Sequence, residues 1–351
     1  MELTKKDTKM IQGLSVLAMV CLHLFCRYEY QGLYQPLIFI KGLPLCFYFA
    51  QLSDFCVAGF AFCSGYSHAV MFENADVKCY YKRRMKGLFS LYLNYWLVVC
   101  VFVVVGLVMK SSTIPGSASE FLLNFLSIKN SYNGAWWYML VYAVLVFISP
   151  VMLKLNQKMN PGVLFALSLL GYAGAAYFRS YSGIDNQIVA WLALFGVTLF
   201  EYLSGAIVYK AKLLTRLSKI DGKLCSSKGL TVLKYSAFAL VYITMLLFHS
   251  LVIGSIAVAP FTGFVIILIF HFTKKPLVTE RFFLFIGKHS TNIWLTHMFF
   301  YSVLFKNFVF GVKYPILIFI FMLITTVAVS VVLNKILSLK RFLPCFKEMQ
   351  S

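Results

Sequence analysis

Charged residues are scarce in this sequence. Asp, Glu, Lys and Arg make up 13% of its 351 residues, whereas a soluble domain usually carries about 25%. Hydrophobic residues make up 60%, which is more apolar surface than a water-soluble fold of this size can bury. The shortage of charge therefore excludes an ordinary soluble protein and predicts that lipid forms part of the solvent.

Acidic residues are the rarer of the charged types, with 12 against 32 basic residues and a formal net charge of +20. Such an excess could indicate nucleic-acid binding. However, the basic residues cluster in short connections between apolar runs, and most of them fall on alternate connections. That distribution is how orientation is set in a bilayer. We therefore expect both termini in the cytoplasm and no nucleic-acid partner.

The nine cysteines lack the spacing of a metal site, because no two of them form a CxxC pair. Most lie within apolar runs and read as small buried residues, so we expect neither a metal site nor a disulfide framework. The N-terminal apolar run holds His23 and lacks a small-x-small cleavage motif. We expect it to be a retained first helix rather than a signal peptide.

About ten apolar runs are long enough to span a membrane as helices of about 20 residues. They predict an all-α, multi-pass membrane protein with a single domain over residues 1–351, since neither an internal repeat nor a soluble segment is evident. The residues from 43 to 72 exceed one untilted span, so the first part is expected to be a tilted extension or a re-entrant piece. The expected helices are 10–27, 53–72, 88–109, 135–154, 162–179, 188–209, 232–251, 254–272, 282–304 and 314–337.

Polar side chains follow one face of the first expected helix. Gln12, Ser15, Met19 and His23 recur at helical spacing and so share a stripe. Ionisable groups inside a span are costly and therefore often functional. For any single histidine, a hydrogen bond to a neighbouring helix is an equally good interpretation. The stripe nevertheless favours His23 as a functional residue.

Two further residues are expected at the depth of His23. At about 1.5 Å per residue, His23 and His297 both lie about 20–22 Å from the cytoplasmic ends of their helices. Asp54 is expected near the outer end of the second helix, where a carboxylate could orient an imidazole. Glu201 is the other acid expected within a span, and either packing or function would explain it.

Three segments have both a structural and a functional interpretation. Ser64-Gly65-Tyr66 could serve helix packing, because glycine lets backbones approach closely. The expected cytoplasmic loop 80–86 is rich in Tyr, Lys and Arg, and could set topology or clamp phosphates. The outer segment 130–138 ends in Trp136-Trp137-Tyr138, which could be an interfacial belt or could stack against a sugar ring.

Taken together, these motifs resemble acyltransferase family 3, a family of membrane acyltransferases. The resemblance rests on five features in the same order and spacing, which extend from residue 12 to about residue 300. The family usually has Lys or Arg where this chain has Gln12, and Lys9 lies one turn earlier on nearly the same face. The five features are Gln12-Gly13-Leu14 with His23; the Phe-rich run 60–66 ending in Ser-Gly-Tyr; the aromatic and basic entry 81–95; Trp137-Tyr138 with Tyr142 and Pro150; and Gly287-Lys288-His289-Ser290 with Trp294 and His297.

The resemblance implies transfer of an acyl group, commonly acetyl, from cytoplasmic acetyl-coenzyme A to a hydroxyl of a carbohydrate. The acceptor would be a cell-surface polysaccharide or its lipid-linked precursor. The protein would lie in the cell membrane, namely the cytoplasmic membrane of a bacterium, and would hold no permanently bound cofactor. The expected catalytic residues are His23, Asp54 and His297. The expected donor-binding residues are Lys9, Gln12, Ser64, Gly65, Tyr66, Lys82, Arg84, Lys86, His289 and Ser290. The expected acceptor-binding residues are Trp136, Trp137 and Tyr138.

Two other function classes fit the same composition. Intramembrane histidines and acids also mark the pathway of a transporter, such as a polysaccharide exporter. Matching halves with broken helices, a usual sign of a transporter, are not evident. A structural partner in a glycan-synthesis complex is the third possibility. Hydrolysis of acetyl-coenzyme A would separate an enzyme from a transporter, and loss of activity on point mutation would separate it from a structural partner.

Overall fold

The computed structural model describes residues 2–181, 187–251 and 257–339. The protein is all-α, as the sequence predicts: it is 81% helical, and the strand content of the described part is one hairpin of two two-residue strands. Its elements fall into two compact units. The first comprises Met1–Glu29, Pro36–Arg83 and Val144–Lys288, and the second comprises Tyr30–Gln35, Arg84–Ala143 and His289–Ser351.

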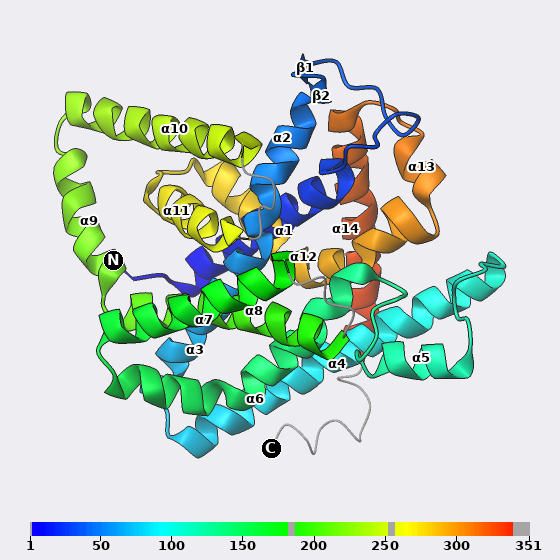
Figure 1. Ribbon diagram of the computed structural model, residues 1–351, viewed down its shortest axis with the longest axis horizontal. Helices are drawn as coiled ribbons and strands as arrows, with labels where there is room; N and C mark the ends of the chain where they lie inside the picture. The colour runs from blue at the N-terminus through cyan, green and yellow to red at the C-terminus, as the bar shows by residue number, and fades with distance from the viewer. Residues whose placement is uncertain (1, 182–186, 252–256, 340–351) are drawn as a thin grey trace. The chain divides into compact units, whose positions relative to one another are not determined.

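All ten expected membrane segments are helical, although their lengths differ from the prediction (Figure 1). Within the described residues, eight helices are long and apolar enough to cross a membrane. The expected segment 254–272 contains the shorter apolar helix α11 (Ala259–Phe272) and otherwise begins in residues outside the described part. The expected segment 282–304 corresponds to α12 (Leu277–Met298), which carries Glu280, Arg281 and Lys288. The multi-pass architecture is confirmed, and the count of ten and the side of the termini stay predictions.

The first unit is built around α3 (Cys56–Glu73) and α8 (Gln187–Lys210), which pack along one another. The helix α7 (Pro161–Tyr181) also packs on α8, and the helix α1 (Lys5–Phe25) packs on α3. The remaining elements are the strands β1 (Phe39–Ile40) and β2 (Leu43–Pro44), α2 (Leu45–Leu52), η1 (Ser53–Phe55), α9 (Leu213–Leu224), α10 (Lys228–Leu251) and α11.

Glycines set the close approach of α3 and α8. A Cβ at Gly65 would collide with the backbone carbonyl of Tyr202, and a Cβ at Gly205 would collide with the carbonyl of Phe62. Because neither glycine has a side chain, the two backbones can touch at both points. The same device joins α1 to α12, where Gly13 meets the carbonyl of Phe283.

Local signals explain where α1 begins. The hydroxyl of Thr4 accepts a hydrogen bond from the Asp7 amide at 3.1 Å, and the Asp7 carboxylate accepts one from the Thr4 amide at 2.9 Å. This reciprocal capping box satisfies two of the amides that a helix start leaves unpaired. Lys6 then forms an ion pair with Glu280 at 2.5 Å, which ties the beginning of α1 to that of α12.

Two lysines of the first unit bind other groups of the protein through their ammonium groups. The Lys234 side chain is 1% exposed and forms an ion pair with Asp221 at 2.5 Å, and it also donates to the carbonyl of Phe272 at 2.7 Å. Lys210 donates to the carbonyl of Asn156 at 2.5 Å and to that of Met159 at 2.5 Å, at the end of α6 (Trp137–Lys158). Each ammonium therefore fixes the end of a neighbouring helix.

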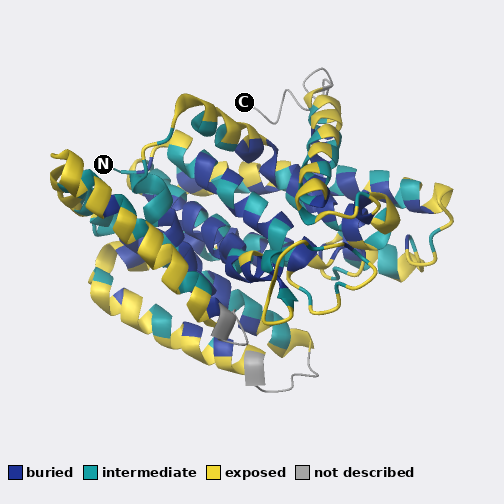
Figure 2. Ribbon diagram, turned by 90° about the horizontal axis from the view of Figure 1, so that it is seen from above, coloured by how far each residue is buried: buried dark blue, intermediate teal, exposed yellow. Residues whose placement is uncertain are grey.

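The second unit contains most of α4 (Val77–Val108), the start of α6, the end of α12 and the whole of α14 (Pro315–Leu339). Its short elements are α5 (Ala118–Phe125), η2 (Gly134–Trp136), η4 (Phe299–Val303) and α13 (Lys306–Phe310). In both units, many helices are buried on one side and exposed on the other (Figure 2). Such faces suit contact with lipid.

Candidate functional site

The predicted polar stripe lies on α1, and its side chains have different surroundings. His23 is in the last turn and is partly buried. Ser15 is fully buried where α1 meets Gly59 of α3. Lys9 donates a hydrogen bond to the side-chain oxygen of Gln12 at 3.0 Å. Lys9 therefore brings a positive charge to Gln12, where the family resemblance expects a basic side chain.

Asp54 lies where the second membrane segment is irregular. The α2 helix ends at Leu52, the 3-10 turn η1 carries Asp54, and α3 begins at Cys56, so the long segment is one helical stretch interrupted by a tight turn. Such mid-helix turns often mark functional positions. Because η1 packs against α1, Asp54 belongs to an element in contact with the helix that carries His23.

Arg27 follows α1 and is close to His23. The guanidinium of Arg27 donates a hydrogen bond to the carbonyl of His23 at 2.9 Å. The imidazole and the guanidinium therefore lie together at the end of α1, while the Asp54 carboxylate is carried by η1, which packs against α1. Of these groups, histidine is the one able to take up and release a proton near neutral pH.

The Ser64-Gly65-Tyr66 motif serves the packing of the first unit. Gly65 allows the contact of α3 with α8, and the Ser64 hydroxyl donates to the carbonyl of Phe60 at 2.9 Å. The Tyr66 hydroxyl accepts from the Leu3 amide at 3.0 Å and donates to the Glu2 carboxylate. The motif thus holds the N-terminal segment, whatever part it also has in donor binding.

The basic segment 80–86 is not a loop, contrary to the prediction. It forms the first turns of α4, a helix of 32 residues. A helix continues here because residues 77–108 contain no proline, and Gly87, which follows the basic residues, does not adopt the positive φ of a helix C-cap. Lys82 and Lys86 are exposed, Arg84 is partly buried, and the ring of Tyr80 is buried with its hydroxyl donating to Ser149 at 2.8 Å.

His297 belongs to the second unit, where it is fully buried at the end of α12. Its Nδ1 lies 2.8 Å from the carbonyl of Trp294, and its ring stacks on Tyr301 with 5.9 Å between centroids. Tyr301 is part of the π-helical turn η4. A π turn is uncommon and frequently occurs at functional sites.

The aromatic segment 136–138 lies directly beside the end of α12. The side-chain amide of Asn133 and the indole of Trp136 both donate to the carbonyl of Leu295, at 2.9 and 3.0 Å. The indole of Trp294 donates back to the carbonyl of Ala135 at 3.0 Å. These bonds bring the segment and the helix turn that carries His297 into one cluster.

The three aromatic residues differ in exposure. Trp136 is 1% exposed, and its indole packs against Tyr95 and Phe299. Trp137 and Tyr138 are partly exposed, and their rings meet edge to face at 5.7 Å. Only Trp137 and Tyr138 of the three therefore present ring surface outside the packed interior.

A buried polar network in the second unit escaped the sequence analysis. Asn94 of α4 donates to Asn292 of α12 at 2.6 Å, and Asn292 donates to Ser330 of α14 at 3.1 Å. Nδ1 of His289 is 2.8 Å from the same Ser330 hydroxyl, and Ser290 beside it is 2% exposed. The signal was present, since His289, Asn292 and Thr296 follow helical spacing and so share one face of α12.

These clusters carry the chemistry that acyl transfer needs, because histidine can take up a proton or carry an acyl group near neutral pH. The sequence model of the acyltransferase 3 family, described as an acyltransferase domain, matches residues 9–335. The chain belongs to the acyltransferase 3 family. The match includes every candidate catalytic, donor-binding and acceptor-binding residue named above. No curated protein and no solved structure matches the chain.

Membership of the acyltransferase 3 family and the eight long apolar helices together make this chain a multi-pass membrane acyltransferase. The resemblance on which the sequence analysis relied is thereby confirmed. The family match does not assign a donor, an acceptor or individual roles to the residues. Those assignments are proposals.

Proposed function

We propose that the chain transfers an acetyl group from cytoplasmic acetyl-coenzyme A to a hydroxyl of a surface or lipid-linked polysaccharide in a bacterial cytoplasmic membrane. The observation that carries this proposal is the end of α1, where His23 is partly buried and η1, with Asp54, packs against the same helix. A histidine beside a carboxylate is the arrangement that activates hydroxyl groups in many acyl-transfer sites.

In the proposed reaction, His23 removes the proton of the acceptor hydroxyl while its oxygen bonds to the thioester carbonyl carbon. The carbon–sulfur bond then breaks, coenzyme A leaves as the thiolate, and the proton held by His23 passes to that sulfur. The atoms balance as an ester plus free coenzyme A. Asp54 supports the step, because a nearby carboxylate stabilises the imidazolium that forms.

Donor binding is assigned to basic side chains at the helix starts. Lys9 with Gln12 on α1, and Lys82 with Arg84 and Lys86 on α4, offer cations to the phosphates of coenzyme A. Arginine suits this role because its planar group can contact a phosphate through two parallel hydrogen bonds. We also assign donor binding to His289 and Ser290, and to the motif Ser64-Gly65-Tyr66.

Acceptor binding is assigned to Trp137 and Tyr138, whose partly exposed rings can stack against a sugar. Trp136 supports them from the interior of the second unit. His297, next to this segment, is the second catalytic candidate and would hold the donor or the acceptor if His23 is the base.

The test compares His23→Ala and His297→Ala for acetyl transfer from labelled acetyl-coenzyme A to the surface polysaccharide. Loss of a general base typically costs about 10²–10⁴-fold in rate, and we expect this loss in His23→Ala. His271→Ala, at the end of α11, is the matched control and should keep normal transfer. Membrane insertion of all three variants is checked first.

The outcomes separate the roles. Normal transfer in His23→Ala together with complete loss in His297→Ala would assign the base to His297. Normal transfer in both would show that the site is not built on these histidines. If the purified protein also failed to hydrolyse acetyl-coenzyme A, this donor would be ruled out and the transport function would gain support.

A further inference from the structure

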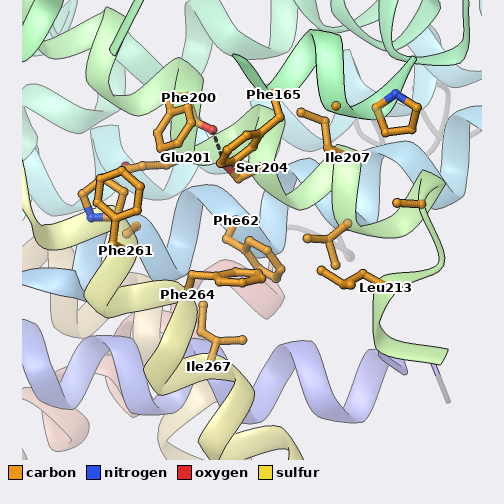
Figure 3. A pocket seen from close by; sticks show the side chains of 16 residues that line it. Phe62, Phe165, Phe200, Glu201, Ser204, Ile207, Leu213, Phe261, Phe264 and Ile267 are labelled. Carbon is orange, nitrogen blue, oxygen red and sulfur yellow. Dashed lines mark hydrogen bonds between the residues drawn. The ribbon is translucent and has the colours of Figure 1, made fainter. Parts of the chain in front are cut away.

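The first unit contains a cavity of about 350 Å³ that none of the residues assigned above lines. Small-molecule sites commonly begin at about 300 Å³. Its walls come from α3, α8 and α11, from the start of α7 and from the link between α8 and α9 (Figure 3). Phe165 and Phe261 on its rim are 39% and 42% exposed, so the cavity opens to the outside of the unit.

The cavity is elongated along α8. At one end Phe200 of α8 faces Phe261 of α11, with ring centroids 6.0 Å apart. At the other end Val208 packs in one cluster with Ile267 and Leu213. The eight residue-to-residue steps from Phe200 to Val208 correspond to about 12 Å of helix. A linear apolar chain fits this shape better than a compact ring system does.

Glu201 is the exception in this apolar wall. Its side chain lines the cavity while the residue is 4% exposed, and its Oε2 has no hydrogen-bond partner among the described residues. Arg179 and Asp54 act on Glu201 electrostatically, but no ion pair joins Glu201 to Arg179. A buried carboxyl oxygen without a partner is costly, so a ligand that donates a hydrogen bond to it would be stabilised.

The rest of the lining restricts the head group of that ligand. Ser204 is the other polar side chain of the wall, and its hydroxyl already donates to the carbonyl of Phe200 at 2.8 Å (Figure 3). An ammonium has three donors and would leave some of them unsatisfied in this cavity, whereas a hydroxyl has one. A carboxylate ligand would be repelled by Glu201.

We propose that this cavity, defined as the Glu201 groove, binds an uncharged amphiphile with one apolar chain and a terminal hydroxyl, the chemistry of a fatty or prenyl alcohol. The chain lies between Phe62, Phe165 and Phe264, and the hydroxyl donates to the Glu201 carboxyl. Entry from the membrane is direct, because the rim is apolar and exposed.

The experiment uses the full chain in lipid nanodiscs without acetyl-coenzyme A, so its result does not depend on the proposed function. A decanol carrying a photoreactive diazirine at the chain end is cross-linked, and the labelled peptides are identified by mass spectrometry. We expect labelling of α3 and α11 at the Glu201 groove. Unlabelled decanol should compete, and decanoate, decylammonium and decane should compete about tenfold less well.

Variants test the groove from two sides. Glu201→Leu should reduce labelling about tenfold or more, because the hydrogen bond to the carboxyl is lost. Leu213→Trp should do the same by filling the rim while Glu201 stays intact. Ile220→Trp, on the exposed side of the same helix α9, is the matched control and should leave labelling unchanged.

Three results would overturn the proposal. Equal labelling in Glu201→Leu and Leu213→Trp would show that the probe does not occupy the groove. Competition by decane as strong as that by decanol would show that any apolar chain fills the groove without using Glu201. Stronger competition by decylammonium would refute the hydroxyl assignment and indicate a cation held by the carboxylate and the phenylalanine rings.

Discussion

Replacement of Gly65 by alanine tests the packing role of this glycine between α3 and α8. A Cβ at this position would overlap the carbonyl oxygen of Tyr202 and lie 2.7 Å from its carbonyl carbon, well below the 3.4–4 Å of ordinary contact. The atoms that it meets are backbone, which cannot rotate away. Extra volume in a packed interface costs about 1–3 kcal/mol, and we expect Gly65→Ala to fall near the upper end.

The assay is reversible unfolding of the purified protein in detergent, followed by the loss of helical signal. Gly205→Ala places a methyl group on the other side of the same contact. The double variant should therefore lose less free energy of unfolding than the two single losses together, because neighbouring sites are not additive. Gly174→Ala, whose Cβ would meet nothing within 4 Å, is the control and should gain about 0.5–1 kcal/mol. Unchanged stability in Gly65→Ala would refute the packing argument.

Three further predictions concern single side chains. Arg84→Ala should weaken acetyl-coenzyme A binding, and Arg84→Lys should weaken it in part, since lysine cannot form the two-bond contact; unchanged titrations would limit Arg84 to a role in topology. Trp137→Leu should lower the affinity for the polysaccharide without unfolding the chain, and an unaltered affinity would identify an interfacial anchor. Hydrogen bonds from Lys129 and then from Ser131 lower the pKa of Glu120. The ionised Glu120 carboxylate therefore stabilises the fold above the usual glutamate pKa, and this stabilisation is lost as the pH falls through the lowered pKa. Unfolding curves of Glu120→Gln should consequently depend less on pH in acid than those of the parent.

The helices could be predicted from the sequence because apolar length is a strong signal in a membrane protein. The ends of the helices could not. The start of α4 was expected to be a loop because basic side chains usually mark connections, yet charged residues are compatible with a helix that extends beyond the membrane. Lys82 and Lys86 show this, since both are exposed on helical turns.

The candidate site was predictable in its titratable residues and less so in its partners. His23 and His297 stood out because histidine is rare inside a membrane. Their surroundings depend on contacts between helices distant in sequence, such as the bonds from Asn133 and Trp136 to Leu295. Asn94 and Ser330 were missed for the same reason, because a single asparagine or serine carries no signal until its partners on other helices are known.

The buried ammonium of Lys234 has a practical consequence for mapping which side of the membrane each connection occupies. Impermeant amine reagents report sidedness only through lysines that they can reach. Lys234 is enclosed by Asp221 and the carbonyl of Phe272, so it should stay unlabelled by reagent added on either side of the membrane. The exposed Lys82 and Lys86 should react with reagent added on one side of the membrane. A labelling map that scored Lys234 as distant from the reagent would misplace the start of α10, so topology is better inferred from Lys82 and Lys86.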